Sequence, residues 1–171
     1  CVVIALAAAD NHVCALDDGG KVACWGTDWD GATAVPDDLG PVVEIAVGNA
    51  HTCARDAEGA ITCWGSAVDA RAQVPPDAGP FAQVVAGAEF TCALGVTGTV
   101  VCTGQADQGQ TMVPEGLGAV VAIAPSPSGE RADSGSLTTN WKRRPPSTIC
   151  VILSPSTRLC RVARICGAGT P

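Results

Sequence analysis

The sequence is poor in large aromatic side chains. Among its 171 residues there is no tyrosine, and only two phenylalanines, four tryptophans and one methionine occur. Valine, isoleucine, leucine, alanine and cysteine must therefore supply most of the packing in any core. No uninterrupted apolar run is long enough to cross a bilayer, so the sequence predicts no membrane span. The length and the composition indicate one globular domain.

Basic residues are scarce in the first three quarters of the chain. Up to residue 125 we count three basic and fifteen acidic side chains, a net charge of −12, whereas residues 126–171 carry a net charge of +5. An acidic surface repels the phosphate backbone, so we expect no binding of nucleic acid by this first part. The basic cluster at 142–144 is too short to change that expectation.

Cysteine, by contrast, is abundant, and six of the ten cysteines belong to a repeat. The sequence HVCALDDGGKVACWG at 12–26 returns as HTCARDAEGAITCWG at 51–65 and as FTCALGVTGTVVCTG at 90–104, with a constant spacing of 39 residues. Repeats of this length are typical of propellers and solenoids, in which each repeat is one supersecondary unit. The units span about 3–41, 42–80 and 81–119, and the start of a fourth lies at 120.

Each unit contains the pattern of a β-hairpin stapled by its two cysteines. In the first unit, a three-residue loop at 18–20 places Cys14 directly opposite Cys24 on the returning strand. Opposed residues on antiparallel strands are close enough for a disulfide. The spacing therefore predicts the bridges Cys14–Cys24, Cys53–Cys63 and Cys92–Cys102, and it assigns no partner to Cys1, Cys150, Cys160 or Cys166. Paired cysteines favour an oxidising compartment, so we expect an extracellular or cell-surface protein.

Further short strands are expected on either side of the hairpin. A β-branched run such as VVEIAVG at 42–48 is typical of a buried inner strand. The segments that end at Pro36, Pro75 and Pro114 suit an outer edge, where proline is tolerated. The sequence thus predicts an all-β fold, a propeller fragment of about three four-stranded blades and a broken fourth.

The run VVEIAVGNAHTCARDAEGAITCWG at 42–65 resembles the regulator of chromosome condensation repeat, as does Gly109-Gln110 in the third unit. The resemblance covers about residues 2–125 and implies a propeller of about seven blades, in a family that includes the beta-lactamase-inhibitor propeller. The short unit and its cysteine pairs look more like the bacterial, exported members, which implies a secreted protein or a lipoprotein. Phe90 stands where the other units have histidine, so this position tolerates change.

The repeat stops inside its fourth copy. Glycine, histidine and two cysteines are expected there, but the chain has Ser126, Gly129, Arg131 and Trp141 at these positions. Residues 126–171 are rich in serine, proline and arginine, so we expect an irregular, disordered tail. A shifted reading frame after about residue 125 explains the abrupt loss of the repeat, and a genuine basic tail is the alternative.

Chemical interpretations of the repeat motif are weaker than a scaffold role. Zinc accepts histidine and cysteine, but structural zinc sites commonly use closely spaced cysteine pairs, and the third unit loses its histidine while it keeps both cysteines. Redox enzymes usually present Cys-x-x-Cys at the start of a helix. We expect His12 and His51 to be structural, and the Asp-Gly loops lack the spacing of a calcium-binding EF-hand. The sequence predicts no catalytic residue, no cofactor and no metal site.

The loops that follow each Cys-Trp-Gly position vary between units and are the expected contact surface. We predict a non-enzymatic scaffold for an unidentified protein partner, with contacts at Asp28, Trp29, Asp30, Asp69, Arg71, Asp107 and Gln110. Packing of Trp29 against the neighbouring unit is the alternative. By analogy with the resembled family, a second candidate function is regulation of an enzyme, either as a cell-wall enzyme inhibitor or in guanine-nucleotide exchange. A third is a truncated product without function.

Overall fold

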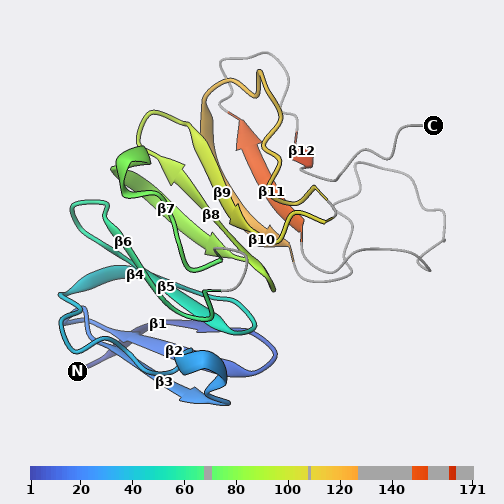
Figure 1. Ribbon diagram of the computed structural model, residues 1–171. Coiled ribbons are helices and arrows are strands. Elements are labelled where there is room, and N and C mark those ends of the chain that lie inside the picture. Colours follow the sequence, from blue (N-terminus) through green and yellow to red (C-terminus); the bar gives the residue numbers. More distant parts are fainter. Residues whose placement is uncertain (68–70, 108, 127–147, 154–161, 165–171) are drawn as a thin grey trace, which may run out of the picture.

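The computed structural model describes residues 1–67, 71–107, 109–126, 148–153 and 162–164, and strands dominate it. Four antiparallel sheets follow one another along the chain, each with three strands in sequence order (Figure 1). The first three sheets are β1 (Val3–Ala8), β2 (His12–Asp17) and β3 (Val22–Gly26), then β4 (Val42–Val47), β5 (His51–Asp56) and β6 (Ile61–Gly65), then β7 (Phe81–Ala86), β8 (Phe90–Gly95) and β9 (Val100–Gly104). The predicted all-β class is confirmed.

The hairpin at the centre of each sheet has the predicted register. Cys14 is paired with Cys24 across β2 and β3, and the backbone N–H of Asp17 donates to the carbonyl of Lys21 at 3.0 Å. Local chemistry explains the turn, because the Asp17 carboxylate accepts the backbone N–H groups of Gly19 and Lys21. Gly20 has the positive φ that this turn requires.

The final glycine of the Cys-Trp-Gly position also has a geometric reason. Gly65 has a φ of 94°, and a Cβ built on it would lie 2.6 Å from the carbonyl oxygen of Ala50. Gly26 and Gly104 have still larger positive φ values, 118° and 117°, and equally close backbone neighbours. This close approach of two backbones explains why the glycine recurs in all three units.

The predicted fourth strand of each blade is not present, since each described sheet has three strands. The segment that leads to Pro36 forms turns, and it contributes side chains rather than backbone ladder bonds. Val35 and Leu39 pack against the core between the first two sheets. Proline removes a backbone donor, which disfavours the extra strand here.

A fourth sheet corrects the expectation of an irregular tail. β10 (Val120–Ser126) pairs with β11 (Thr148–Leu153), which pairs with β12 (Val162–Arg164). The register of β10 and β11 shifts between Val120 and Ala122, as it does between Val3 and Ala5 in the first sheet. The β-branched run in β11 favours a strand, and this local preference was missed because the repeat spacing was lost. The other residues of the predicted tail lie outside the described part.

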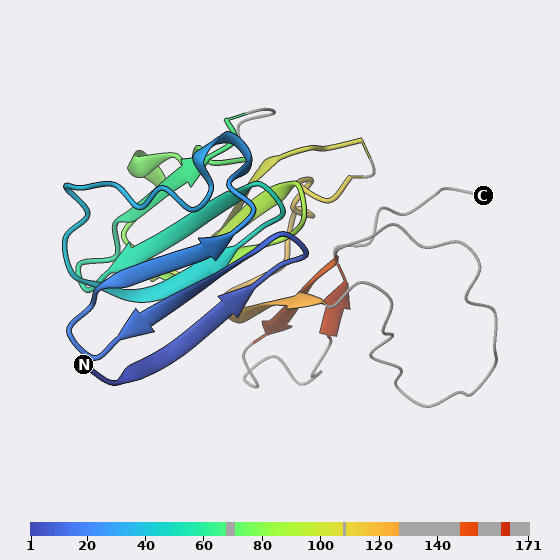
Figure 2. The same ribbon diagram turned by 90° about the horizontal axis from the view of Figure 1, so that it is seen from below.

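The core lies between the sheets, which are packed face to face in chain order (Figures 1 and 2). We call the face toward the following sheet the back face, and the face toward the preceding sheet the front face. Leu16 on the first back face packs with Val42 and Ile45 on the second front face. Phe90 on the third back face packs with Val120 and Ile123 on the fourth front face. No helix in the described residues is long and apolar enough to cross a membrane.

Candidate functional site

The first loop after the Cys-Trp-Gly position is held in a defined conformation. It contains the short 3-10 helix η1 (Trp29–Gly31), in which Asp30 adopts the left-handed backbone conformation with a φ of 53°. The carboxylate of Asp28 accepts the backbone N–H of Thr33 at 2.9 Å and the Thr33 hydroxyl at 2.7 Å. These two bonds hold the pKa of Asp28 below its usual value, and the bond from the Thr33 backbone N–H has the larger effect. The loop is therefore closed by its own side chains.

Trp29 projects from this loop and is 55% exposed. About half of the Trp29 side chain is therefore accessible, and its role as a partner contact stays a prediction. The next sheet is contacted by the backbone of the loop, because the Ala32 carbonyl accepts the indole N–H of Trp64 at 3.0 Å. The same loop thus contacts the next sheet through Ala32 and exposes Trp29.

The other predicted contact residues differ in their surroundings. Asp107 is exposed and accepts a hydrogen bond from the Gln105 amide at 2.7 Å. Gln110 is half-buried, and Asp69 lies outside the described residues. Arg71 is buried and forms an ion pair with Glu89, so the structure does not place it on the open surface. This pairing was missed because Glu89 belongs to the next unit.

The two histidines form the same bond between neighbouring sheets. His12 Nε2 lies 2.7 Å from the hydroxyl of Thr52, and His51 Nε2 lies 2.8 Å from the hydroxyl of Thr91. Each threonine hydroxyl in turn donates to a loop carbonyl, that of Ala32 or of Arg71, respectively. A hydroxyl has one proton, so it must accept from the histidine, and Nε2 of each ring carries the hydrogen.

This arrangement makes the histidines structural rather than catalytic. Nδ1 of each ring is buried and has no hydrogen-bond partner in the described part of the chain. A second proton would place an unsolvated charge there, and burial lowers the pKa of both rings. For His51, burial and then the charges of Arg71 and His12 lower the pKa to about 4. Both imidazoles are thus neutral at pH 7.

The sequence did not reveal three parts of this hydrogen-bond network, namely Thr52, Thr91 and the Ala32 carbonyl. The threonines share one column of the repeat, in which the first unit has Val13. The column could have been noticed, because a threonine next to each of His51 and Phe90 is a polar residue in an apolar strand. The hydrogen-bond partner of each threonine could not have been recognised from the sequence, because the facing histidine lies in the preceding unit.

All three predicted cysteine pairs are at disulfide distance. Their Cα atoms are separated by 4.1 Å for Cys14–Cys24, 4.0 Å for Cys53–Cys63 and 4.1 Å for Cys92–Cys102. Cys14, Cys53 and Cys92 are completely buried between sheets. The pairs therefore join the central and outer strands of each sheet and fill the space next to the following one.

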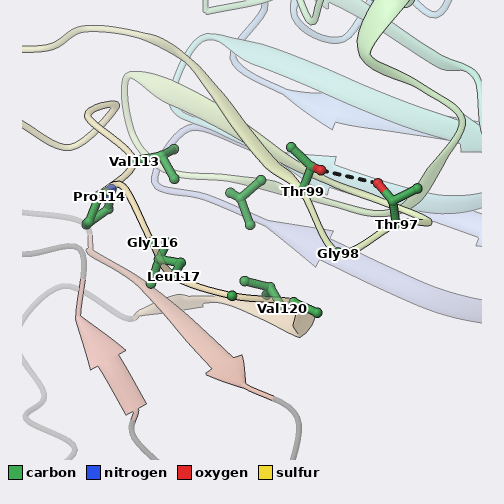
Figure 3. Close-up of a pocket in the computed structure, with 11 residues that line it drawn as sticks. Thr97, Gly98, Thr99, Val113, Pro114, Gly116, Leu117 and Val120 are labelled. Carbon is green, nitrogen blue, oxygen red and sulfur yellow. Dashed lines mark hydrogen bonds between the residues drawn. The ribbon is translucent and has the colours of Figure 1, made fainter. Parts of the chain in front are cut away.

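A cavity of about 340 Å³ lies between the β8–β9 turn and the loop that leads to β10 (Figure 3). Its polar lining includes the hydroxyls of Thr97 and Thr99, which are 3.2 Å apart, and it contains no charged side chain. Val113 and Leu117 from this loop pack against the core, as Val35 and Leu39 do in the first unit. The cavity is therefore part of the repeat scaffold. In the described residues no group of three or more His, Cys, Asp or Glu side chains could hold a metal ion.

Comparisons with known proteins agree with this architecture. Residues 42–68 and 81–110 match the model of the regulator of chromosome condensation (RCC1) repeat. No curated protein matches the sequence. Similar solved structures include Prp20p of Saccharomyces cerevisiae, at 20% identity and a TM-score of 0.53, with 64% of this chain and 34% of Prp20p covered. The predicted propeller fold is confirmed by this likeness.

Two plant receptor kinases are also similar. The ectodomain of CR4 from Physcomitrella patens is 26% identical with a TM-score of 0.56, and 71% of this chain and 35% of that ectodomain are covered. The ectodomain of ACR4 from Arabidopsis thaliana is 28% identical with a TM-score of 0.50, and the coverage is 61% and 39%. The chain thus spans little more than a third of the length of these proteins.

Proposed function

Because residues 42–68 and 81–110 match the RCC1 repeat model and the fold is that of a propeller, we propose that the chain is a non-enzymatic scaffold that binds a protein partner through the loops that follow each Cys-Trp-Gly position. We name the described residues of these loops, 27–34, 66–67, 71–73, 105–107 and 109–112, the loop rim. The observation that carries the proposal is Trp29, an exposed aromatic side chain on a loop fixed by the Asp28–Thr33 bonds. A rigid aromatic anchor loses little conformational entropy on binding, and tryptophan is enriched at binding hot spots.

The charges of the loop rim define the chemistry of the partner. Asp28, Asp30 and Asp107 are exposed, whereas Arg71 is buried in its ion pair with Glu89. The rim therefore presents negative charge around an apolar side chain. A protein surface with an apolar pocket bordered by lysine or arginine would be complementary to it.

The compartment we propose is the outside of the cell or its surface. The support is the set of three cysteine pairs at disulfide distance, because such bonds persist in oxidising surroundings. Thiol counting on the exported protein under non-reducing conditions tests this. Protection of all six repeat cysteines is expected, and reactive thiols at Cys53 and Cys63 would contradict the proposed compartment.

Regulation of an enzyme is the second candidate function. Its support is that Prp20p, a similar structure, has binding properties toward Gsp1p and histones, which makes protein binding compatible with this fold. Within this proposal the partner is itself an enzyme, such as a cell-wall enzyme or a GTPase. A captured partner whose turnover or nucleotide release changes when the chain binds would favour this function over a passive scaffold.

Site-specific photo-crosslinking tests the loop rim directly. A photoreactive residue replaces Trp29, and a matched probe replaces Val96, which is 62% exposed in the turn between β8 and β9. We expect crosslinked adducts with the partner from position 29 and none from position 96. We also expect that a chain with the single change Trp29→Ala no longer captures the partner. Equal adducts from both positions would show that the loop rim is not the binding surface.

A further inference from the structure

The loop at 27–34 is attached to the next sheet at Ala32. This residue is completely buried, and its carbonyl accepts two hydrogen bonds, from the Trp64 indole N–H at 3.0 Å and from the Thr52 hydroxyl at 2.9 Å. Both donors belong to the second unit, whereas the loop belongs to the first. The conformation of this loop is therefore determined in part by the neighbouring sheet.

The backbones of the loop and of β6 also come into contact at this point. A Cβ built on Gly65 would lie 3.0 Å from the Cα of Ala32, so a residue with a side chain would push the loop away from the strand. Gly65 follows Trp64 directly in β6. The Trp64 ring is 8% exposed and packs in the core between the first two sheets, which fixes the direction of its N–H.

Ala32 is in turn bonded to the backbone of Trp29. Its N–H donates to the Trp29 carbonyl at 3.0 Å and closes η1, while the Asp28–Thr33 bonds close the loop around the same turn. Two successive hydrogen bonds thus lead from the Trp64 indole through Ala32 to the backbone of Trp29. A buried residue of the second sheet therefore holds the segment that carries the exposed tryptophan of the first unit.

The equivalent loops of the other two units lack parts of this arrangement. Alanine stands at the position of Asp28 in both, so neither has the carboxylate that closes the first loop. In the second unit the anchoring carbonyl is that of Arg71, which accepts the Thr91 hydroxyl at 2.7 Å, but Thr103 replaces the tryptophan donor. The Thr103 hydroxyl is buried and has no hydrogen-bond partner in the described part of the chain. The first loop thus has the more complete attachment.

The first loop needs this attachment because its conformation is intrinsically unfavourable. Asp30 has a left-handed backbone with a φ of 53°, which costs free energy in a residue that has a side chain. Without its bonds to the next sheet, the loop would relax toward other conformations. A partner that recognises one conformation binds with an affinity proportional to the population of that conformation. The donors to the Ala32 carbonyl therefore affect binding through the position of Trp29.

We propose that Trp64 is a positioning residue for partner binding, which holds the loop that presents Trp29 from the neighbouring sheet. The inference rests on the proposed function and deepens it in two ways. It identifies the first of the three loops as the one prepared for the partner, and it adds a buried residue of the second unit to the binding site. Trp64 acts on binding without contact to the partner.

Hydrogen exchange of the full chain, detected by NMR, tests the positioning without a partner. Trp64→Phe keeps an aromatic ring in the core and removes the N–H donor, and the third unit shows that the column tolerates the loss of tryptophan. We expect the backbone amides of Ala32 and Thr33 to exchange roughly fivefold faster, and those at the centre of β5 to change less. Equal acceleration at both places would show general destabilisation and would overturn the positioning role.

Two further variants make this measurement specific. Trp25→Phe is the matched control, because Trp25 has the same place in the preceding unit and is 52% exposed, and it should leave the exchange of the loop amides unchanged. Thr52→Val removes the other donor to the Ala32 carbonyl and should accelerate the same amides. Circular dichroism verifies that each variant is folded. Unchanged exchange of the loop amides in both Trp64→Phe and Thr52→Val would overturn the proposal.

Titration with the protein crosslinked at position 29 tests the consequence for binding. Trp64→Phe should raise the dissociation constant by roughly three- to fivefold, whereas Trp25→Phe should leave it unchanged. Unchanged affinity of Trp64→Phe despite faster exchange of the loop amides would overturn the proposal and leave the function of the loop rim intact. The absence of any adduct at position 29 would instead overturn the proposed function and, with it, the binding role of Trp64, even where exchange shows that Trp64 holds the loop.

Discussion

The interfaces between the sheets use two different chemistries at one repeat position. Between the first and second sheets, and between the second and third, a histidine donates to a threonine of the next sheet. Between the third and fourth sheets the same position is Phe90, which packs with Val120 and Ile123. In the fourth sheet, Ile149 lies at the register position of the threonine. The residue at this position is therefore polar in the first two sheets and apolar in the third.

This difference separates what holds the sheets together from what specifies their order. All three interfaces bury the first cysteine of the hairpin and the apolar residues of the inner strand, so these groups provide the shared stabilisation. The polar and apolar pairs are mutually exclusive, because a histidine opposite an apolar residue leaves its N–H unsatisfied. We infer that this position discourages sheets from packing in the wrong order.

The largest effect is expected at the apolar interface. Phe90→Ala removes a fully buried ring from the cluster that joins the third and fourth sheets and should lower the free energy of unfolding by about 3–5 kcal/mol. Chemical denaturation followed by circular dichroism measures this loss. Phe90→Leu, which keeps much of the apolar volume, is the control and should cost less. A loss for Phe90→Ala no greater than that for Phe90→Leu would show that this interface does not depend on the ring.

The polar interface should respond to acid in a way that the apolar one does not. The pKa of His51 is about 4 in the folded chain and 6.5 in its ordinary state, so the unfolded chain binds the proton first as pH falls. The free energy of unfolding is therefore highest above pH 6.5. It falls between pH 6.5 and 4, by about 3 kcal/mol in total. Denaturation at a series of pH values measures this slope.

His51→Phe is the matched variant, because the third unit has phenylalanine at this position. Thr91 keeps its bond to the Arg71 carbonyl in this variant, so the hydroxyl remains satisfied. The variant should lose most of the pH dependence between 6.5 and 4. If its slope equals that of the original chain, another group titrates in this range and the burial of His51 is not the cause.

The features within one unit could be predicted from the sequence. Hairpin register depends on a turn of a few residues, and the repeat gives three independent copies of it, so the pairing of Cys14 with Cys24 follows from local spacing. The match to the RCC1 repeat model and the confirmed propeller fold rest on the same columns. Trp29 could be proposed as an exposed residue because its loop varies between units.

The features between units could not be predicted in the same way. The bonds of His12 to Thr52 and of Arg71 to Glu89 join residues in different units, and no local pattern specifies such partners. The fourth sheet was missed for a related reason, since β11 restores the backbone register without the cysteine and glycine spacing. The predicted outer strand failed because the segment packs its side chains into the core.

The smallest effect is expected from removing one hydroxyl at the polar interface. Thr52→Val reproduces the residue of the first unit, but here it leaves the His12 N–H buried without its acceptor. The Ala32 carbonyl still accepts the indole N–H of Trp64, so only one group loses its partner, and we expect a loss of about 1–3 kcal/mol in the free energy of unfolding. Thr52→Ser retains the hydroxyl and should lose less. Because slow exchange of the His12 Nε2 proton in NMR spectra requires the hydroxyl acceptor, it should persist in Thr52→Ser and disappear in Thr52→Val, whereas its persistence in both would show that the bond does not join the two sheets.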